Sequence, residues 1–190
     1  MLEKIDISVI RKTLSNKQSN IKTYLMIMSN LHKVNVSKDN EFQKKFTWFY
    51  GMRYLQQSFR TTYYDYMEEH KSCLITFEDV LMYLYNSTSR VEASFSSKML
   101  ATINPNMPIW DTNVLSQLSI TPPRYNQKDR LKQLKEAVKK YAIIEDWYIN
   151  YLKTQNAKDV LDVFDEMFPN IQMTDVKKID WALWSMGEKT

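Results

Sequence analysis

The sequence predicts an all-α fold, a single globular domain over residues 1–190 with roughly eight or nine helices. The chain holds only two glycines and five prolines, too few for the many tight turns of a β-rich fold. Hydrophobic residues make up 44% and charged residues 25%, which is typical of a folded protein. Apolar residues recur at helical spacing, and no segment keeps the alternation of a strand. Two lobes around a cleft fit the same pattern, with residues 1–75 and 124–190 in one lobe and residues 76–123 in the other.

The first part of the chain predicts helices at about residues 4–14, 16–31 and 38–70. Ser15 or Asn16 is the expected start of the second helix and Ser37 of the third, because these side chains accept hydrogen bonds from unpaired backbone N–H groups. Gly51 is the weak point of the third helix, since glycine costs about 1 kcal/mol in a helix interior.

The rest of the chain predicts helices at about residues 76–85, 91–103, 111–120, 127–155, 157–168 and 174–186. Thr76 and Asp79 have the spacing of a capping box, in which each side chain accepts a hydrogen bond from the backbone of the other residue. Residues 86–89 have the side chains of a turn and are expected to end that helix. The segment 180–184 is expected to close the core, without a chemical role.

Residues that bind metals and cofactors are scarce in this sequence. Cys73 is the single cysteine, which excludes a disulfide framework and a site of four thiolates for zinc or an iron–sulfur cluster. His32 and His70 lie in different predicted helices with no Glu or Cys at ligand spacing, so no metal site is expected. The rarity of glycine also excludes a glycine-rich phosphate-binding loop, and no cofactor is expected.

Charge and hydropathy limit the location and the partners. The N-terminal segment carries acidic residues and lacks a long apolar stretch, so it is not expected to be a signal peptide. No run approaches the ~20 apolar residues that a membrane-spanning helix needs, and we expect a cytoplasmic protein with no membrane partner. The 26 basic and 22 acidic residues give a net charge of +4, which permits a nucleic-acid partner without requiring one.

Asp111 is the candidate for chemistry, because it follows the proline-rich segment 104–110 and begins a predicted helix. One interpretation is structural. A carboxylate at this position accepts backbone hydrogen bonds from the first helical turn and lies at the positive end of the helix dipole. The other interpretation is catalytic and depends on the residues that surround Asp111.

The segment Trp110-Asp111-Thr112-Asn113-Val114 resembles the V-D-T-N-V motif of the helix-hairpin-helix DNA glycosylases, whose aspartate is catalytic. In an ungapped alignment with that family, residues 87–95 fall on the hairpin and residues 96–103 on its second helix. The resemblance implies double-stranded DNA as the partner, Asp111 as the catalytic residue, and Trp110 and Asn113 in the pocket for the extruded base. The DNA contacts that it suggests are Ser87, Thr88, Ser89, Arg90 and Lys98.

A basic run between residues 124 and 140 supplies further candidate phosphate contacts, Arg124 and Lys128 first among them. The alternative interpretation of this run is a solvated helix face, because Asp129 and Glu136 are interspersed in it.

Three positions differ from the family pattern, and the third affects the expected reaction. Ser89 and Val91 replace the hairpin glycines, and Ala93 falls on the lysine that forms a Schiff base in the bifunctional members. This register implies a monofunctional glycosylase, which hydrolyses the N-glycosidic bond. An alternative register places Lys98 on the lysine position, with a shorter loop before Asp111.

The sequence therefore supports two hypotheses. The first is a DNA-binding protein with a glycosylase-like core, either a base-excision enzyme or a relative that keeps the scaffold without the catalysis. The alternative is a non-enzymatic helical interaction or regulatory protein. It predicts Asp111 as a buried helix cap, with no cleft beside it and no positive surface facing it.

Overall fold

The computed structural model of the chain describes residues 1–123 and 129–187. Over these residues it contains ten α-helices, one short 3-10 helix and no strand, so the all-α prediction is confirmed. The first elements are α1 (Ile7–Leu14), α2 (Gln18–Asn30), α3 (Asn40–Phe49), η1 (Met52–Tyr54), α4 (Gln57–His70) and α5 (Phe77–Thr88). They are followed by α6 (Ala93–Ile103), α7 (Thr112–Gln117), α8 (Arg130–Tyr151), α9 (Gln155–Met167) and α10 (Asp175–Gly187). None of the described helices is long and apolar enough to cross a membrane.

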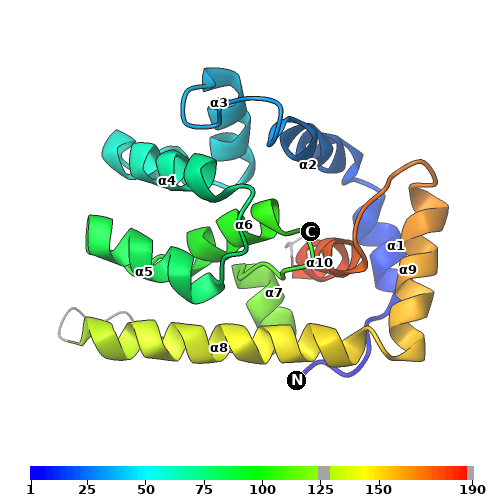
Figure 1. The fold of residues 1–190 in the computed structure, drawn as a ribbon. Coiled ribbons are helices and arrows are strands. Elements are labelled where there is room, and N and C mark those ends of the chain that lie inside the picture. Colours follow the sequence, from blue (N-terminus) through cyan, green and yellow to red (C-terminus); the bar gives the residue numbers. More distant parts are fainter. Residues whose placement is uncertain (124–128, 188–190) are drawn as a thin grey trace.

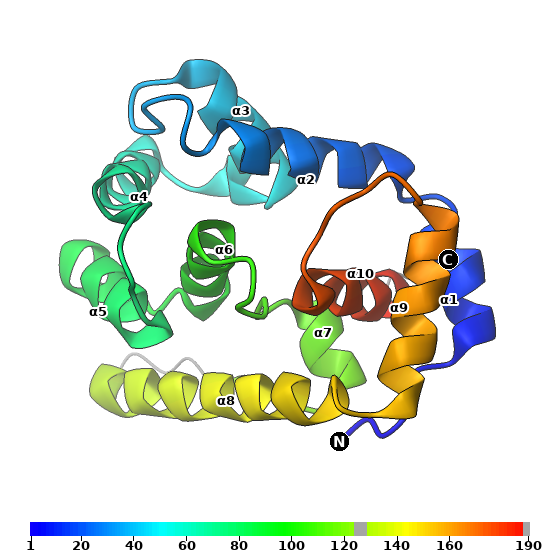
Figure 2. The same ribbon diagram turned by 45° about the vertical axis from the view of Figure 1, so that its right-hand side comes forward.

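The helices α6, α7 and α10 lie in the middle of the molecule (Figures 1 and 2). The long helix α8 runs along one side, next to α5 and α7, while α2, α3 and α4 form the opposite side. Helices α1 and α9 close one end, where both pack with α10. Asp111 immediately precedes α7, so the candidate for chemistry lies near the centre of this arrangement.

The predicted long helix over residues 38–70 is three elements in the structure, and this division is the main difference from the expected helix count. Its weak point is the predicted one: Gly51 has a φ of 73°, a left-handed conformation that favours glycine. The helix α3 begins after Asp39, whose carboxylate accepts a hydrogen bond of 2.7 Å from the N–H of Phe42. Asp39 therefore takes the capping role that the sequence suggested for Ser37.

The buried apolar side chains form two core clusters. The first joins α1 and the start of α2 to α7, α8, α9 and α10. The second joins the end of α2 to α3, η1 and α4. Helices α5 and α6 contribute to both, since Leu81 and Leu100 belong to the first cluster and Leu84 and Met99 to the second. The α5–α6 pair therefore connects two separately packed groups of helices.

The capping box predicted at Thr76 is present. The Oγ of Thr76 accepts the N–H of Asp79 at 3.1 Å, and the Asp79 carboxylate accepts the N–H of Thr76 at 2.8 Å. We expect Thr76→Ala to lower the free energy of unfolding by about 1 kcal/mol, because the N–H of Asp79 loses its acceptor and the Asp79 carboxylate loses the Thr76 hydroxyl. Urea unfolding followed by circular dichroism measures this change. Thr61→Ala, at an exposed position inside α4, is the matched control and is expected to change stability by less than about 0.5 kcal/mol. Equal losses in both variants would contradict the capping role.

Candidate functional site

The segment before Asp111 is fixed by side chains from distant helices. The backbone N–H of Trp110 donates to the Oγ of Ser97 on α6 at 2.8 Å. The hydroxyl of Tyr141 on α8 donates to the carbonyl of Pro108 at 2.8 Å. All four of these residues are buried, so the chain reaches Asp111 in one defined conformation.

Asp111 has two roles that use different carboxylate oxygens. Its Oδ1 accepts the N–H of Asn113 at 2.9 Å, which caps α7 as the structural interpretation predicts. Its Oδ2 lies 3.8 Å from the Nζ of Lys98 on α6. The side chains retain 23% exposure at Asp111 and 12% at Lys98, so the pair is sheltered without being sealed. The cap therefore leaves one oxygen available for chemistry.

Lys98 and Asp111 line a cavity of about 320 Å³, here called the Asp111 cavity. It lies where the two core clusters meet, since its lining comes from α2, α3, α6, α7 and α10. Five aromatic side chains line it: Tyr24, Phe49, Tyr50, Trp181 and Trp184. A cavity with aromatic walls and a few charged groups is the usual form of a small-molecule site.

Burial changes the protonation of Lys98. Removal from water lowers the pKa of its ammonium, and the nearby Asp111 carboxylate opposes this shift. The Nζ also donates to the carbonyl of Tyr50 at 3.3 Å and lies 5.2 Å from the centre of the Phe95 ring. A lysine in this environment carries a larger share of the nucleophilic free amine than a surface lysine does.

A second buried pair, Lys177 and Asp180, lines the same cavity from α10. The Lys177 Nζ lies 2.6 Å from Asp180 Oδ2, and the hydroxyl of Tyr148 donates to Asp180 Oδ1. Burial raises the pKa of Asp180, while the Lys177 ammonium and these hydrogen bonds lower it. The sequence interpretation gave the segment 180–184, which includes Asp180, no chemical role and named none for Lys177. The signal that could have identified the pair is a Lys and an Asp three residues apart, directly before the apolar segment 181–184.

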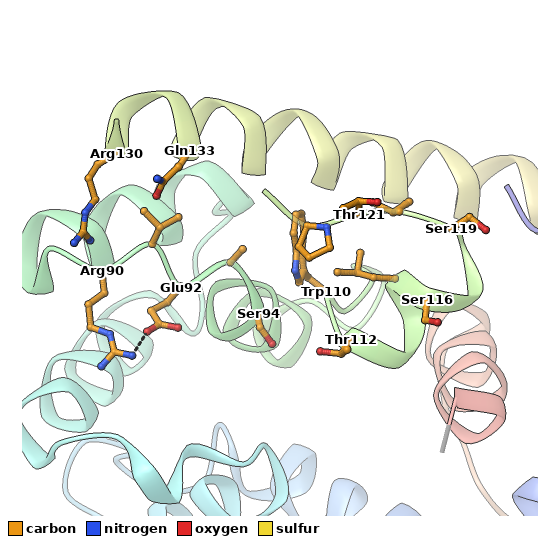
Figure 3. Close-up of a pocket in the computed structure, with 15 residues that line it drawn as sticks. Arg90, Glu92, Ser94, Trp110, Thr112, Ser116, Ser119, Thr121, Arg130 and Gln133 are labelled. Carbon is orange, nitrogen blue, oxygen red and sulfur yellow. Dashed lines mark ion pairs between the residues drawn. The ribbon is translucent and has the colours of Figure 1, made fainter. Parts of the chain in front are cut away.

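A larger cavity of about 940 Å³ lies on the other side of α7, against the N-terminal end of α8 (Figure 3). Arg90, Glu92 and Arg130 gather at one end of it. The Arg90 guanidinium lies 2.6 Å from the Glu92 carboxylate, and Arg130 donates to the carbonyl of Ser89. Burial raises the pKa of Glu92, while Arg90 opposes the shift. Arg90 therefore belongs to a different cavity from Asp111.

The candidate DNA contacts among the described residues do not lie together. Ser87 and Thr88 belong to the last turn of α5, and Ser89 ends it with a left-handed φ of 55°, a conformation that usually favours glycine. Lys98 lies in the Asp111 cavity instead of near this turn. Arg124 and Lys128 lie outside the described residues, and their candidate role stays a prediction.

The candidate base-pocket residues lie around the Asp111 cavity without lining it. Trp110 is 4% exposed, lines the larger cavity, and stacks parallel to Phe77 with 6.3 Å between ring centres. The side-chain amide of Asn113 donates to the carbonyl of Trp184 at 3.4 Å and packs against Gly187. In this arrangement Trp110 supports the fold of the site, while Asn113 joins α7 to α10.

Among the described residues, no group of three or more His, Cys, Asp or Glu side chains could hold a metal ion. Comparison with protein-family models, curated proteins and solved structures gives no match for this chain. The function is therefore argued from the Asp111 cavity and its charged residues.

Proposed function

We propose that the protein is a base-excision DNA glycosylase, with Asp111 as the catalytic carboxylate. The observation that carries this proposal is the position of Asp111: one oxygen faces Lys98 at 3.8 Å in a cavity with aromatic walls. The likeness of residues 110–114 to the catalytic motif of the helix-hairpin-helix glycosylases supports it. So does the helix–turn–helix formed by α5 and α6, which precedes Asp111 as the likeness requires.

The proposed reaction starts when the target nucleotide turns out of the duplex and its base enters the Asp111 cavity. As the N-glycosidic bond lengthens, positive charge develops on the sugar and negative charge on the departing base. The Asp111 carboxylate stabilises the positive charge, and in a sheltered cavity this attraction is stronger than in water. A water then adds to the sugar carbon, so the products are the free base and an abasic site.

Surface side chains supply candidate contacts for the DNA. Trp48 and Tyr54 lie on either side of cavity residues 49–51 in the sequence, and their side chains are 61% and 90% exposed. The Arg53 guanidinium lies 5.7 Å and 5.9 Å from the centres of these two rings. Exposed aromatic rings beside a cation are a common surface for stacking on bases and pairing with phosphates.

The alternative, a non-enzymatic interaction protein, is favoured by one observation, the hydrogen bond of 2.9 Å through which Asp111 caps α7. That hypothesis expects no cleft beside Asp111 and no positive surface facing it. The cavity that Asp111 lines supports the enzyme instead.

The test uses duplex oligonucleotides that carry uracil, hypoxanthine, 8-oxoguanine or an alkylated adenine at one position. Alkali cleaves the strand at each abasic site, so base release is read as a shorter labelled strand. The proposal expects release of at least one base and duplex binding that weakens as salt increases. Absence of both at low salt would remove the enzymatic proposal.

Lys98 gives a separate prediction, because its free amine can attack the aldehyde of an abasic site. The amine adds to the carbonyl carbon, water leaves, and borohydride reduces the resulting imine to a stable amine link. We expect a covalent protein–DNA adduct whose yield rises with pH and levels off below 10.5, since burial lowers the pKa of Lys98 from that ordinary value.

Denaturing electrophoresis of the borohydride-treated mixture measures this adduct. Lys98→Met keeps the shape of the aliphatic chain and is expected to abolish the adduct. Lys45→Met, at a surface lysine paired with Glu41, is the control and is expected to leave the yield unchanged. An adduct that persists in Lys98→Met would assign the reaction to another amine.

A further inference from the structure

Lys177 has more hydrogen-bond donors than the protein provides acceptors for. The residue is 2% exposed, yet it lines the Asp111 cavity. Its ammonium has three N–H groups, and the Asp180 carboxylate is its one hydrogen-bond acceptor among the described residues. Its other contact is the face of the Tyr24 ring, 5.7 Å from Nζ to ring centre. Because buried donors without acceptors cost free energy, this geometry calls for an acceptor inside the cavity.

The carboxylate beside Lys177 already has three donors. Asp180 accepts hydrogen bonds from Lys177, from the hydroxyl of Tyr148 and from the backbone N–H of Ile109. About one of its four acceptor sites remains for a donor of a ligand. This end of the cavity therefore suits a ligand group that accepts hydrogen bonds. The Lys177 ammonium would repel a positively charged ligand group.

Trp181, another residue of the same wall, also has a donor without a partner in residues 1–123 and 129–187. The indole Nε1 of Trp181 is a buried polar atom with no hydrogen-bond partner in the described part of the chain. Trp181 and Trp184 both line the cavity, and their rings meet edge to face with centres 5.5 Å apart. Aromatic side chains stack on any base, so they do not distinguish one base from another. Hydrogen-bond donors can make this distinction.

We propose that Lys177 donates a hydrogen bond to a ring carbonyl of the extruded base. The substrates are then neutral bases that carry such a carbonyl, as uracil, hypoxanthine and 8-oxoguanine do. Bases without a ring carbonyl are then poor substrates. Two examples are 1,N6-ethenoadenine, which is neutral, and 3-methyladenine, which is cationic in DNA. This assignment rests on the proposed glycosylase function.

The test compares base release from duplexes that hold each of these bases, for the wild-type chain and for Lys177→Met/Asp180→Asn. The double variant removes the donor without leaving an unpaired buried carboxylate. We expect it to slow release of the carbonyl-bearing bases by about tenfold to a hundredfold, the usual effect of losing one charged hydrogen bond. Lys178→Met/Asp165→Asn changes the adjacent pair, whose Asp165 side chain is 52% exposed, and is expected to change nothing.

Three outcomes would overturn the assignment. In the first, the wild-type chain releases ethenoadenine or 3-methyladenine faster than any carbonyl-bearing base. In the second, the Lys177→Met/Asp180→Asn chain releases every base at the wild-type rate. Both results contradict the role of Lys177 while the glycosylase function stands. The third outcome concerns the binding of free bases and applies if the wild-type chain releases no base.

If the wild-type chain releases no base, the glycosylase function fails and the binding of free bases decides the role of Lys177. Trp181 and Trp184 line the cavity, so their fluorescence reports an occupant. Quenching by uracil or hypoxanthine that is lost in Lys177→Met/Asp180→Asn supports a site for carbonyl-bearing rings. Quenching by neither base, or equal quenching in the double variant, overturns it.

Discussion

Asp111→Asn is expected to reduce base release by about a hundredfold to a thousandfold while the fold stays intact, the magnitude typical of losing one group that stabilises developing charge. Asparagine is as good a helix cap as aspartate, so its side-chain oxygen can still accept the N–H of Asn113. It carries no negative charge, so it cannot stabilise a positively charged sugar. Single-turnover base release, measured on the best substrate of the wild-type chain, gives the rate ratio.

The control for this variant is Asp39→Asn. Asp39 caps α3 through the N–H of Phe42 at 2.7 Å and lines neither of the two cavities. Both variants are expected to melt within a few degrees of the wild-type chain, because each keeps a capping oxygen. Full activity in Asp111→Asn would show that Asp111 only fastens the start of its helix, and the enzymatic proposal would fall.

Asp180→Leu is expected to cost about 3–5 kcal/mol of unfolding free energy, the usual loss when one partner of a buried ion pair is removed. The side chains of Lys177 and Asp180 are 3% and 6% exposed, so the Lys177 ammonium stays buried after the change and loses its carboxylate partner. The hydroxyl of Tyr148 also loses its acceptor. Urea unfolding followed by far-ultraviolet circular dichroism measures the loss.

The neighbouring ion pair provides the comparison. Lys178 lies 2.6 Å from Asp165, whose side chain is 52% exposed, and Asp165→Leu is expected to cost about 1 kcal/mol or less. The double variant Lys177→Met/Asp180→Leu is expected to recover most of the stability lost in Asp180→Leu, because no unpaired charge remains. Equal costs for Asp180→Leu and Asp165→Leu would contradict the buried character of the first pair.

Local features of the fold could be predicted from the sequence. The Thr76 capping box, the weak point at Gly51 and the helix that starts after Asp111 depend on a few adjacent residues, and all three are present. The cap of α3 was misplaced by two residues, because Ser37 and Asp39 are both good caps and only the final path of the chain selects one.

The composition of the Asp111 cavity could not be predicted in the same way. Lys98, Asp111 and Lys177 come from three elements whose meeting depends on tertiary packing. The family likeness suggested Lys98 as a DNA contact, whereas its Nζ lies 3.8 Å from Asp111 Oδ2. Lys177 was missed for another reason. Hydrophobic periodicity predicts that the charged residues of a helix face solvent, whereas α10 is buried on nearly every side.

The division of the interior into two clusters has a mechanical consequence. The Asp111 cavity lies at their meeting point, and Gly51, with its left-handed φ of 73°, is part of its wall. Helices α5 and α6 belong to both clusters, so they hold the two sides of the cavity together. An occupant that touches both clusters would add contacts between them, so hydrogen exchange should slow in the residues around the cavity.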